Sequence, residues 1–105
     1  MVNVKTPVDC LTKEDVRDEI DRLDEKLVRL FAERQGFVRR MSELKQHPDE
    51  AFDAERIEKM IAVIRKRAEE LGLEADQVDL VWRTLIDWNI AFEQRVIAHR
   101  LEKSA

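Results

Sequence analysis

Two cationic side chains lie on the apolar face of one predicted helix. Arg34 occupies a position at which the heptad spacing of the surrounding apolar residues predicts an apolar side chain, and Lys45 follows eleven residues later. At roughly 100° and about 1.5 Å per residue, the two side chains lie about 20° apart on the helical wheel and about 16 Å apart along the axis. A guanidinium keeps its proton, so burying it without an anion is costly. The pattern therefore predicts a site for a small dianionic ligand between Arg34 and Lys45.

Four further polar residues stand where they can complete such a site. Asn89 and Glu93 are four residues apart and share one face of a predicted third helix. Glu55 lies near the start of a predicted second helix. Arg17 lies about 100° from Arg34 on the wheel of the same helix. We therefore expect Arg17 to reach a site only across a dimer, in the partner subunit.

The chemistry that these residues suit is electrostatic. The sequence shows no nucleophile–base pair, no glycine-rich phosphate loop and no metal-ligand spacing; His47 and His99 are isolated, and Cys10 has no neighbouring base. We therefore predict neither a metal nor a cofactor. Fixed cations beside an amide and a carboxylate suit a reaction that needs only positioning and stabilisation of developing negative charge.

A structural interpretation of the same residues stays open. A single polar residue in a heptad seam often only sets the register, which would account for Arg34. Lys45 at a helix end is commonly a solvated residue that complements the dipole, and Asn89 and Glu93 could close a core network with Arg34. The chain would then be a non-catalytic helical dimerisation module.

A long first helix must carry the cations. It is predicted from Thr12, as N-cap, to about Lys45, because Pro48 disfavours helix at the residue before it. Its apolar residues form a heptad seam: Val16, Ile20, Leu23, Leu27, Leu30, Phe37, Met41 and Leu44. We expect residues 1–11 to form an extended N-terminal arm.

Two further helices complete an all-α domain of residues 1–105. Residues 48–52 are predicted as a short loop. The second helix begins near Asp53 and ends before Gly72, and the third is capped by Asp76. Their apolar stripes are Ile57, Met60, Ile61, Ile64, Ala68 and Leu71, and then Val78, Val81, Trp82, Leu85, Ile86, Ile90, Phe92, Val96 and Ile97.

The length of the first helix predicts a homodimer. About 34 residues span about 50 Å, whereas a compact 105-residue domain has a radius of gyration of about 13 Å. The apolar seam of this helix would be exposed to water unless a second chain covered it. A kink near Gly36, folding the helix back into a monomeric bundle, is the alternative.

Composition excludes several classes of partner. With 19 basic and 23 acidic residues and a pI near 5.3, the chain lacks the positive charge of a nucleic-acid-binding protein. No apolar run approaches the length of a membrane span. The single cysteine, Cys10, excludes an intrachain disulfide framework, and we expect a reducing, cytoplasmic location.

The spacing of Arg17, Ala32-Glu33-Arg34 and Lys45, followed by Glu55-Arg56 and by Asn89 and Glu93, resembles the all-helical class of chorismate mutases. The resemblance covers about Lys5 to Arg100. It implies an intertwined, three-helix homodimer that rearranges chorismate to prephenate without a cofactor.

The resemblance also implies a role for each of these residues. Arg34 and Arg17 of the partner subunit would hold the two carboxylates of chorismate, Lys45 would donate to the ether oxygen, and Glu55 would hold the ring hydroxyl. Many members have glutamine where Glu93 stands, so Glu93 must be protonated or paired with a cation. Ala51 and Ala54 stand where some mutases have an aspartate and an arginine.

A second resemblance involves the same fold. The arm Lys5-Thr6-Pro7-Val8-Asp9-Cys10 and the run 86–91 are similar to bacterial isochorismate-pyruvate lyase, which makes salicylate and pyruvate. Asn89 and Glu93 depart from the tyrosine and glutamine expected there. We therefore expect a chorismate mutase, with the lyase as the alternative.

Overall fold

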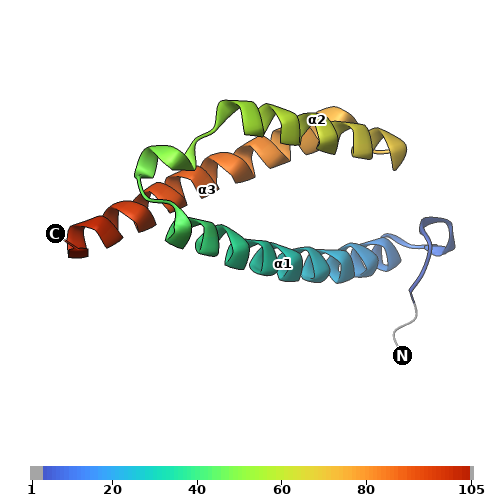
Figure 1. Ribbon diagram of the computed structural model, residues 1–105. Helices are drawn as coiled ribbons and strands as arrows, with labels where there is room; N and C mark the ends of the chain where they lie inside the picture. Colours follow the sequence, from blue (N-terminus) through green and yellow to red (C-terminus); the bar gives the residue numbers. More distant parts are fainter. Residues whose placement is uncertain (1–3, 105) are drawn as a thin grey trace. The chain divides into compact units, whose positions relative to one another are not determined.

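The computed structural model describes residues 4–104, which form three α-helices and two 3₁₀ turns and contain no strand (Figure 1). The helices are α1 (Lys13–Leu44), α2 (Ala54–Glu70) and α3 (Ala75–Ser104), and the turns are η1 (Pro7–Asp9) and η2 (Pro48–Ala51). The predicted all-α class and the long first helix are thus confirmed. No helix in this part of the chain combines the length and apolar character needed to cross a bilayer.

The chain divides into two compact units between Phe37 and Val38, inside α1. The helix is continuous in secondary structure through Gly36; the predicted alternative of a kink there stays a prediction. The boundary divides α1 itself: residues 13–37 belong to the first unit and residues 38–44 to the second.

The N-terminal arm is tied to the start of α1. Thr12 caps the helix as predicted, since its hydroxyl accepts from the amide of Asp15 at 3.0 Å. The Asp15 carboxylate accepts from the amide of Leu11 at 3.1 Å and lies 3.2 Å from Lys5 Nζ. These contacts lower the pKa of Asp15, the amide of Leu11 being the larger cause. The arm is not wholly extended, because Pro7 begins a 3₁₀ turn.

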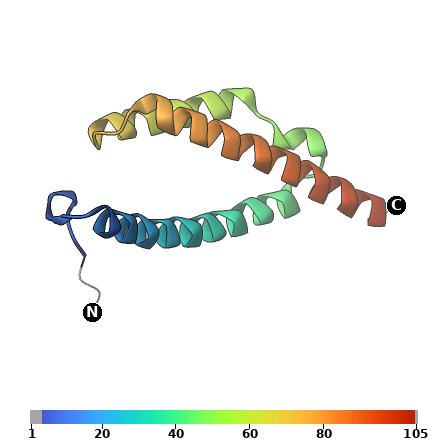
Figure 2. The same cartoon turned by 180° about the vertical axis from the view of Figure 1, so that it is seen from behind.

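In the second unit, α2 and α3 lie side by side and run in opposite directions (Figures 1 and 2). Asp53 caps α2 as predicted, with its carboxylate 3.1 Å from the amide of Arg56. Gly72 has a φ of 77°, and the amide of Leu73 bonds the carbonyl of Ala68 at 2.8 Å, which is a Schellman ending. This glycine lets the chain turn directly into α3.

One local prediction for this unit was wrong, and the structure adds detail to another. Asp76 is not the cap of α3, because the helix already begins at Ala75 and the Asp76 carboxylate pairs with Arg65 at 3.0 Å. The predicted loop 48–52 contains the turn η2, in which Glu50 accepts from the amides of Gln46 and His47 at 2.6 and 2.7 Å.

The buried core is small, and it lies in the second unit. Its apolar members are Ala51, Ile61, Ala68, Val78, Ile86 and Ile97. Only some residues of the predicted stripes belong to it, since Val81 is 44% exposed and Leu71 60%. In α1, Ser42 alone is buried, and the predicted heptad seam is exposed, from 43% at Val16 to 72% at Phe37.

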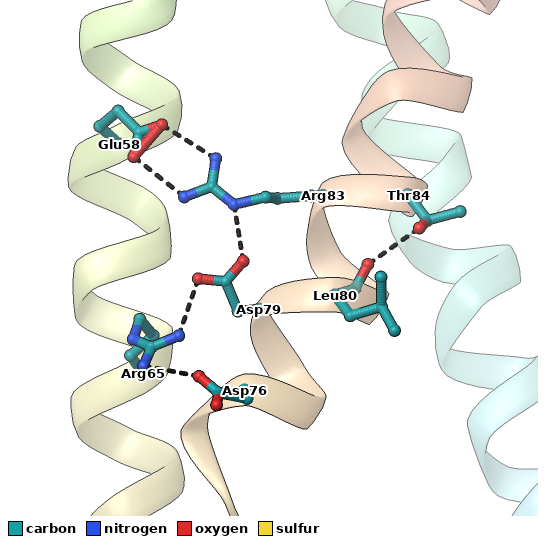
Figure 3. Close-up of polar contacts among 7 residues, drawn as sticks. All are labelled: Glu58, Arg65, Asp76, Asp79, Leu80, Arg83 and Thr84. Atoms are coloured by element: carbon teal, nitrogen blue, oxygen red, sulfur yellow. Dashed lines mark hydrogen bonds and ion pairs between the residues drawn. The ribbon is translucent and has the colours of Figure 1, made fainter.

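Ion pairs join α2 to α3 beside this core (Figure 3). The Arg83 guanidinium holds both oxygens of Glu58, at 2.9 and 3.0 Å, and donates from Nε to Asp79 at 2.6 Å. Asp79 also accepts from Arg65 at 2.8 Å. The Arg83 guanidinium is the first cause that lowers the pKa of both Glu58 and Asp79 below their ordinary values.

Because of these ion pairs, we expect the folded protein to lose stability in acid. A carboxylate whose pKa is lowered on folding stabilises the fold above its ordinary pKa, and this contribution is lost as the pH falls through the lowered value. The ordinary values are 4.5 for Glu58 and 3.8 for Asp79. We therefore expect the melting temperature to fall as the pH is lowered below about 4.5, and to fall less in the double variant Glu58→Gln/Asp79→Asn.

The control for this measurement is Glu69→Gln, at an exposed position of α2. That variant should melt like the natural protein at each pH. An equal fall in the double variant and the natural protein would show that the Arg83 ion pairs do not contribute.

Candidate functional site

The structure brings Lys45 and Glu93 together, 48 residues apart in the sequence. Lys45 follows the last residue of α1, and its amide still bonds the carbonyl of Met41 at 3.0 Å. Its Nζ lies 2.9 Å from Glu93 Oε1, and the two side chains are 22% and 10% exposed. The contact is an ion pair and not an aligned hydrogen bond, since Glu93 Oε1 has no hydrogen-bond partner within residues 4–104.

Asn89 lies one turn before Glu93 on α3, as predicted. It is 5% exposed, and neither its Oδ1 nor its Nδ2 has a hydrogen-bond partner in the described part of the chain. Buried polar atoms in proteins are nearly always hydrogen-bonded. One amide with both a donor and an acceptor unsatisfied therefore points to a partner outside this chain: a ligand, water or a second subunit.

Lys45 pairs with Glu93, and Asn89 lies one turn before Glu93 on α3; we call these three residues the α1–α3 cluster. It offers an ammonium and an amide N–H as donors, and a carboxylate and an amide oxygen as acceptors. It contains no nucleophile. Its chemistry is therefore to bind oxygen atoms of a polar ligand and to stabilise charge on them.

The other predicted site residues are not members of the cluster. Glu55 lies in the first turn of α2, is exposed, and pairs with Lys59 at 3.0 Å. Arg17 and Arg34 belong to the part of α1 in the first unit, where Arg17 is exposed and Arg34 half-buried. Of the six predicted residues, Lys45 and Glu93 are thus in contact, and the part of Arg17 and Arg34 stays a prediction.

Sequence reasoning missed Arg100, which lies beside Lys45. Its guanidinium donates to the carbonyls of Ser42 at 2.7 Å, of Glu43 at 2.9 Å, and of Lys45. Arg100 stands seven residues after Glu93, so both project from the same face of α3. The spacing between Glu93 and Arg100 was the only indication of this contact in the sequence, because the atoms that accept from Arg100 are backbone carbonyls.

Aromatic contacts also join the end of α1 to α3. The Arg39 guanidinium lies over the Phe92 ring, 5.1 Å from its centroid, and Trp88 stacks on Phe92 with centroids 5.6 Å apart. Ser42, fully buried, donates to the carbonyl of Arg39. The last turns of α1 are therefore packed on α3 around the cluster.

A cavity of about 210 Å³ opens between the start of α2 and the middle of α3. It is lined by Phe52, Ala54, Ile57, Glu58, Arg83, Ile86 and Asp87. Ile86 lies one turn before Asn89 and is buried like it. The cavity and the cluster thus share one face of α3.

Comparisons with known proteins agree on one family. The family model described as chorismate mutase type II matches residues 16–94. Isochorismate pyruvate lyase of Pseudomonas aeruginosa is 34% identical over 88 residues, which are 84% of this chain and 87% of that protein. T-protein of Haemophilus influenzae is 35% identical over 82 residues, 77% of this chain and 22% of that protein. The bifunctional chorismate mutase/prephenate dehydratase of Buchnera aphidicola is 27% identical over 82 residues, 77% and 21% of the two chains.

Proposed function

The chain belongs to the chorismate mutase type II family, and on that premise we propose that it rearranges chorismate to prephenate. The observation that carries the proposal is the α1–α3 cluster, in which a partly desolvated ammonium pairs with Glu93, one turn along α3 from a buried amide without partners in the described residues. In the rearrangement the ether carbon–oxygen bond breaks as a carbon–carbon bond forms. Such a concerted step requires no nucleophile, and the cluster has none.

Three basic residues have a part in this proposal. Arg34 and Arg17 of the partner subunit hold the two carboxylates of the substrate, and Lys45 donates to the ether oxygen as negative charge develops there. Donors aimed at a developing charge in a water-poor site are among the largest contributions to catalysis. The low exposure of the Lys45 side chain supports this role. Glu55, on the exposed start of α2, would hold the ring hydroxyl.

Glu93 has a different part from the basic residues. Its Oε1 lies 2.9 Å from Lys45 Nζ, and a carboxylate accepts hydrogen bonds but cannot donate one to the ether oxygen. We therefore propose that Glu93 holds the ammonium of Lys45 in place and does not itself donate to the substrate.

The substitution Glu93→Gln tests this step. Because an amide can donate a hydrogen bond to the ether oxygen and a carboxylate cannot, the variant should turn over chorismate faster than the natural protein. We expect a rise in kcat of up to about tenfold, the value of one hydrogen bond to a charged group. The measurement is kcat at one fixed pH, with Glu102→Gln at an exposed position of α3 as control. A kcat unchanged by Glu93→Gln removes Glu93 from the mechanism.

We further propose that two chains form the active enzyme. The exposed heptad seam of α1 is unusual for a helix in water, since contiguous exposed apolar surface commonly marks an interface. A second copy would cover the seam and bring Arg17 of the partner subunit to the site. Sedimentation at about twice the 12.4 kDa mass of the chain supports the dimer, and sedimentation at the monomer mass contradicts it.

Isochorismate-pyruvate lyase activity is the second candidate. It is favoured by the identity of 34% to the Pseudomonas aeruginosa protein across 87% of that protein's length. A lyase would use the same cations to stabilise charge as pyruvate leaves isochorismate. Asn89 favours the mutase, because it differs from the tyrosine that the resemblance leads us to expect in the lyase. Glu93 does not separate the two candidates, since glutamine is expected at this position in the lyase and in many mutases.

A paired assay with chorismate and isochorismate separates the candidates. Prephenate as the efficient product supports the mutase, and salicylate with pyruvate supports the lyase. Neither product, from a folded dimer, would favour a dimerisation module. The unsatisfied amide of Asn89 argues against that module, because it would require a closed polar network. Independence from cofactors and a cytoplasmic location stay predictions.

A further inference from the structure

We propose that Arg100 is a positioning residue, which fixes Lys45 by closing the C-terminal end of α1. The inference rests on the proposed function in one respect, namely that Lys45 acts on the substrate. The contact itself is a property of the fold: a guanidinium on α3 bonds three backbone carbonyls at the end of another helix.

The end of α1 needs such a partner. The last four carbonyls of an α-helix have no intrahelical donor, and they carry the negative end of the helix dipole. The last turn of α1 contains no basic residue that could serve them. Arg100 supplies both the donors and the positive charge from 55 to 58 residues further along the chain.

Arg100 and Glu93 together hold Lys45 at two points. Arg100 Nη2 bonds the carbonyl of Lys45, and Glu93 lies against its ammonium at 2.9 Å. Both residues project from the same face of α3. The lysine side chain has several rotatable bonds, so its ammonium can occupy many positions unless the backbone of Lys45 is fixed. A misplacement of about 1 Å can lower a catalytic rate about 10²-fold.

The shape of the guanidinium is suited to this task. One planar group presents several donors in fixed directions, whereas a lysine ammonium is a single point of charge on a flexible chain. In this structure Nη1 serves two carbonyls and Nη2 serves a third. Lysine at position 100 would therefore keep the favourable charge and lose most of the geometry.

The test uses Arg100→Gln and Arg100→Lys in the full chain. The control is Arg95→Gln, at an exposed position of the same helix. The first readout is amide hydrogen exchange over residues 41–45, which needs no activity. We expect exchange to rise about tenfold or more in Arg100→Gln, to rise less in Arg100→Lys, and to stay unchanged in the control. Unchanged exchange in Arg100→Gln would overturn the proposal.

The second readout connects Arg100 to catalysis. In Arg100→Gln, kcat should fall about 10- to 100-fold with a much smaller change in KM. The same substitution in a Lys45→Ala background should have little further effect, because residues that act through one another are not additive. An equal fall of kcat in both backgrounds would show that Arg100 does not act through Lys45. Arg100→Lys keeps the test valid if Arg100→Gln does not fold.

Failure of the proposed function has a different signature. In that case the natural protein makes neither prephenate nor salicylate, and the exchange readout by itself decides whether Arg100 holds the end of α1. A natural protein that is active, with normal exchange and normal kcat in Arg100→Gln, would contradict the positioning role alone.

Discussion

Replacing Lys45 by alanine is expected to lower kcat for the rearrangement about 10²- to 10³-fold, the usual effect of removing one donor to a developing oxyanion. KM should change much less, because the ammonium interacts most strongly with charge that exists only in the transition state. The low exposure of this side chain, 22%, limits the ability of water to replace it. The measurement is steady-state formation of prephenate.

The substitution also leaves Glu93 without its cation, and that effect must be separated. Removing one member of a poorly exposed ion pair destabilises the remaining charge. The double variant Lys45→Ala/Glu93→Gln removes the unpaired carboxylate and should restore stability but not turnover. Lys66→Ala, at an exposed position of α2, is the matched control. A rise in KM at unchanged kcat would show that Lys45 binds substrate without acting in the reaction.

The substitution Arg34→Ala should lower kcat/KM at least about 100-fold. The proposed reason is that a guanidinium holds a carboxylate through charge-assisted hydrogen bonds, which are the strongest of their kind. The dimer should stay intact or become more stable, since a half-buried cation is removed from an apolar seam. Turnover and sedimentation are measured on the same preparation.

Arg29→Ala is the matched control for Arg34→Ala. Arg29 lies on the same helix, is exposed, and forms a surface ion pair with Glu25 at 2.9 Å. Pairs of this kind contribute little to stability, so the control should be active and dimeric. If Arg34→Ala unfolds or becomes monomeric, Arg34 is a structural residue of the seam and not a ligand of the substrate.

Local sequence signals predicted the helices well. Thr12, Asp53 and Gly72 mark helix ends in the structure as they do in the sequence, because capping depends on a few neighbouring residues. Asp76 shows the limit of such signals. It has the residue type of a cap, yet its carboxylate pairs with Arg65 on the neighbouring helix.

The periodicity of the sequence predicted the apolar faces of the helices, but not which residues on those faces are buried. Val16 and Phe37 belong to a regular seam, and both are largely exposed in this chain. Burial depends on what packs against a face, and the pattern of one helix does not contain that information. The proposed partner subunit would supply the missing cover.

The sequence by itself determined the types and faces of the reactive residues: Lys45 at the end of one helix, and Asn89 and Glu93 one turn apart on another. Only the tertiary structure decided that Lys45 meets Glu93 and that Arg100 bonds the end of α1. The physical reason is that these contacts join segments about 50 residues apart through packing of whole helices. Arg100 also recognises backbone carbonyls, which every residue carries, so its partners leave no mark in the sequence.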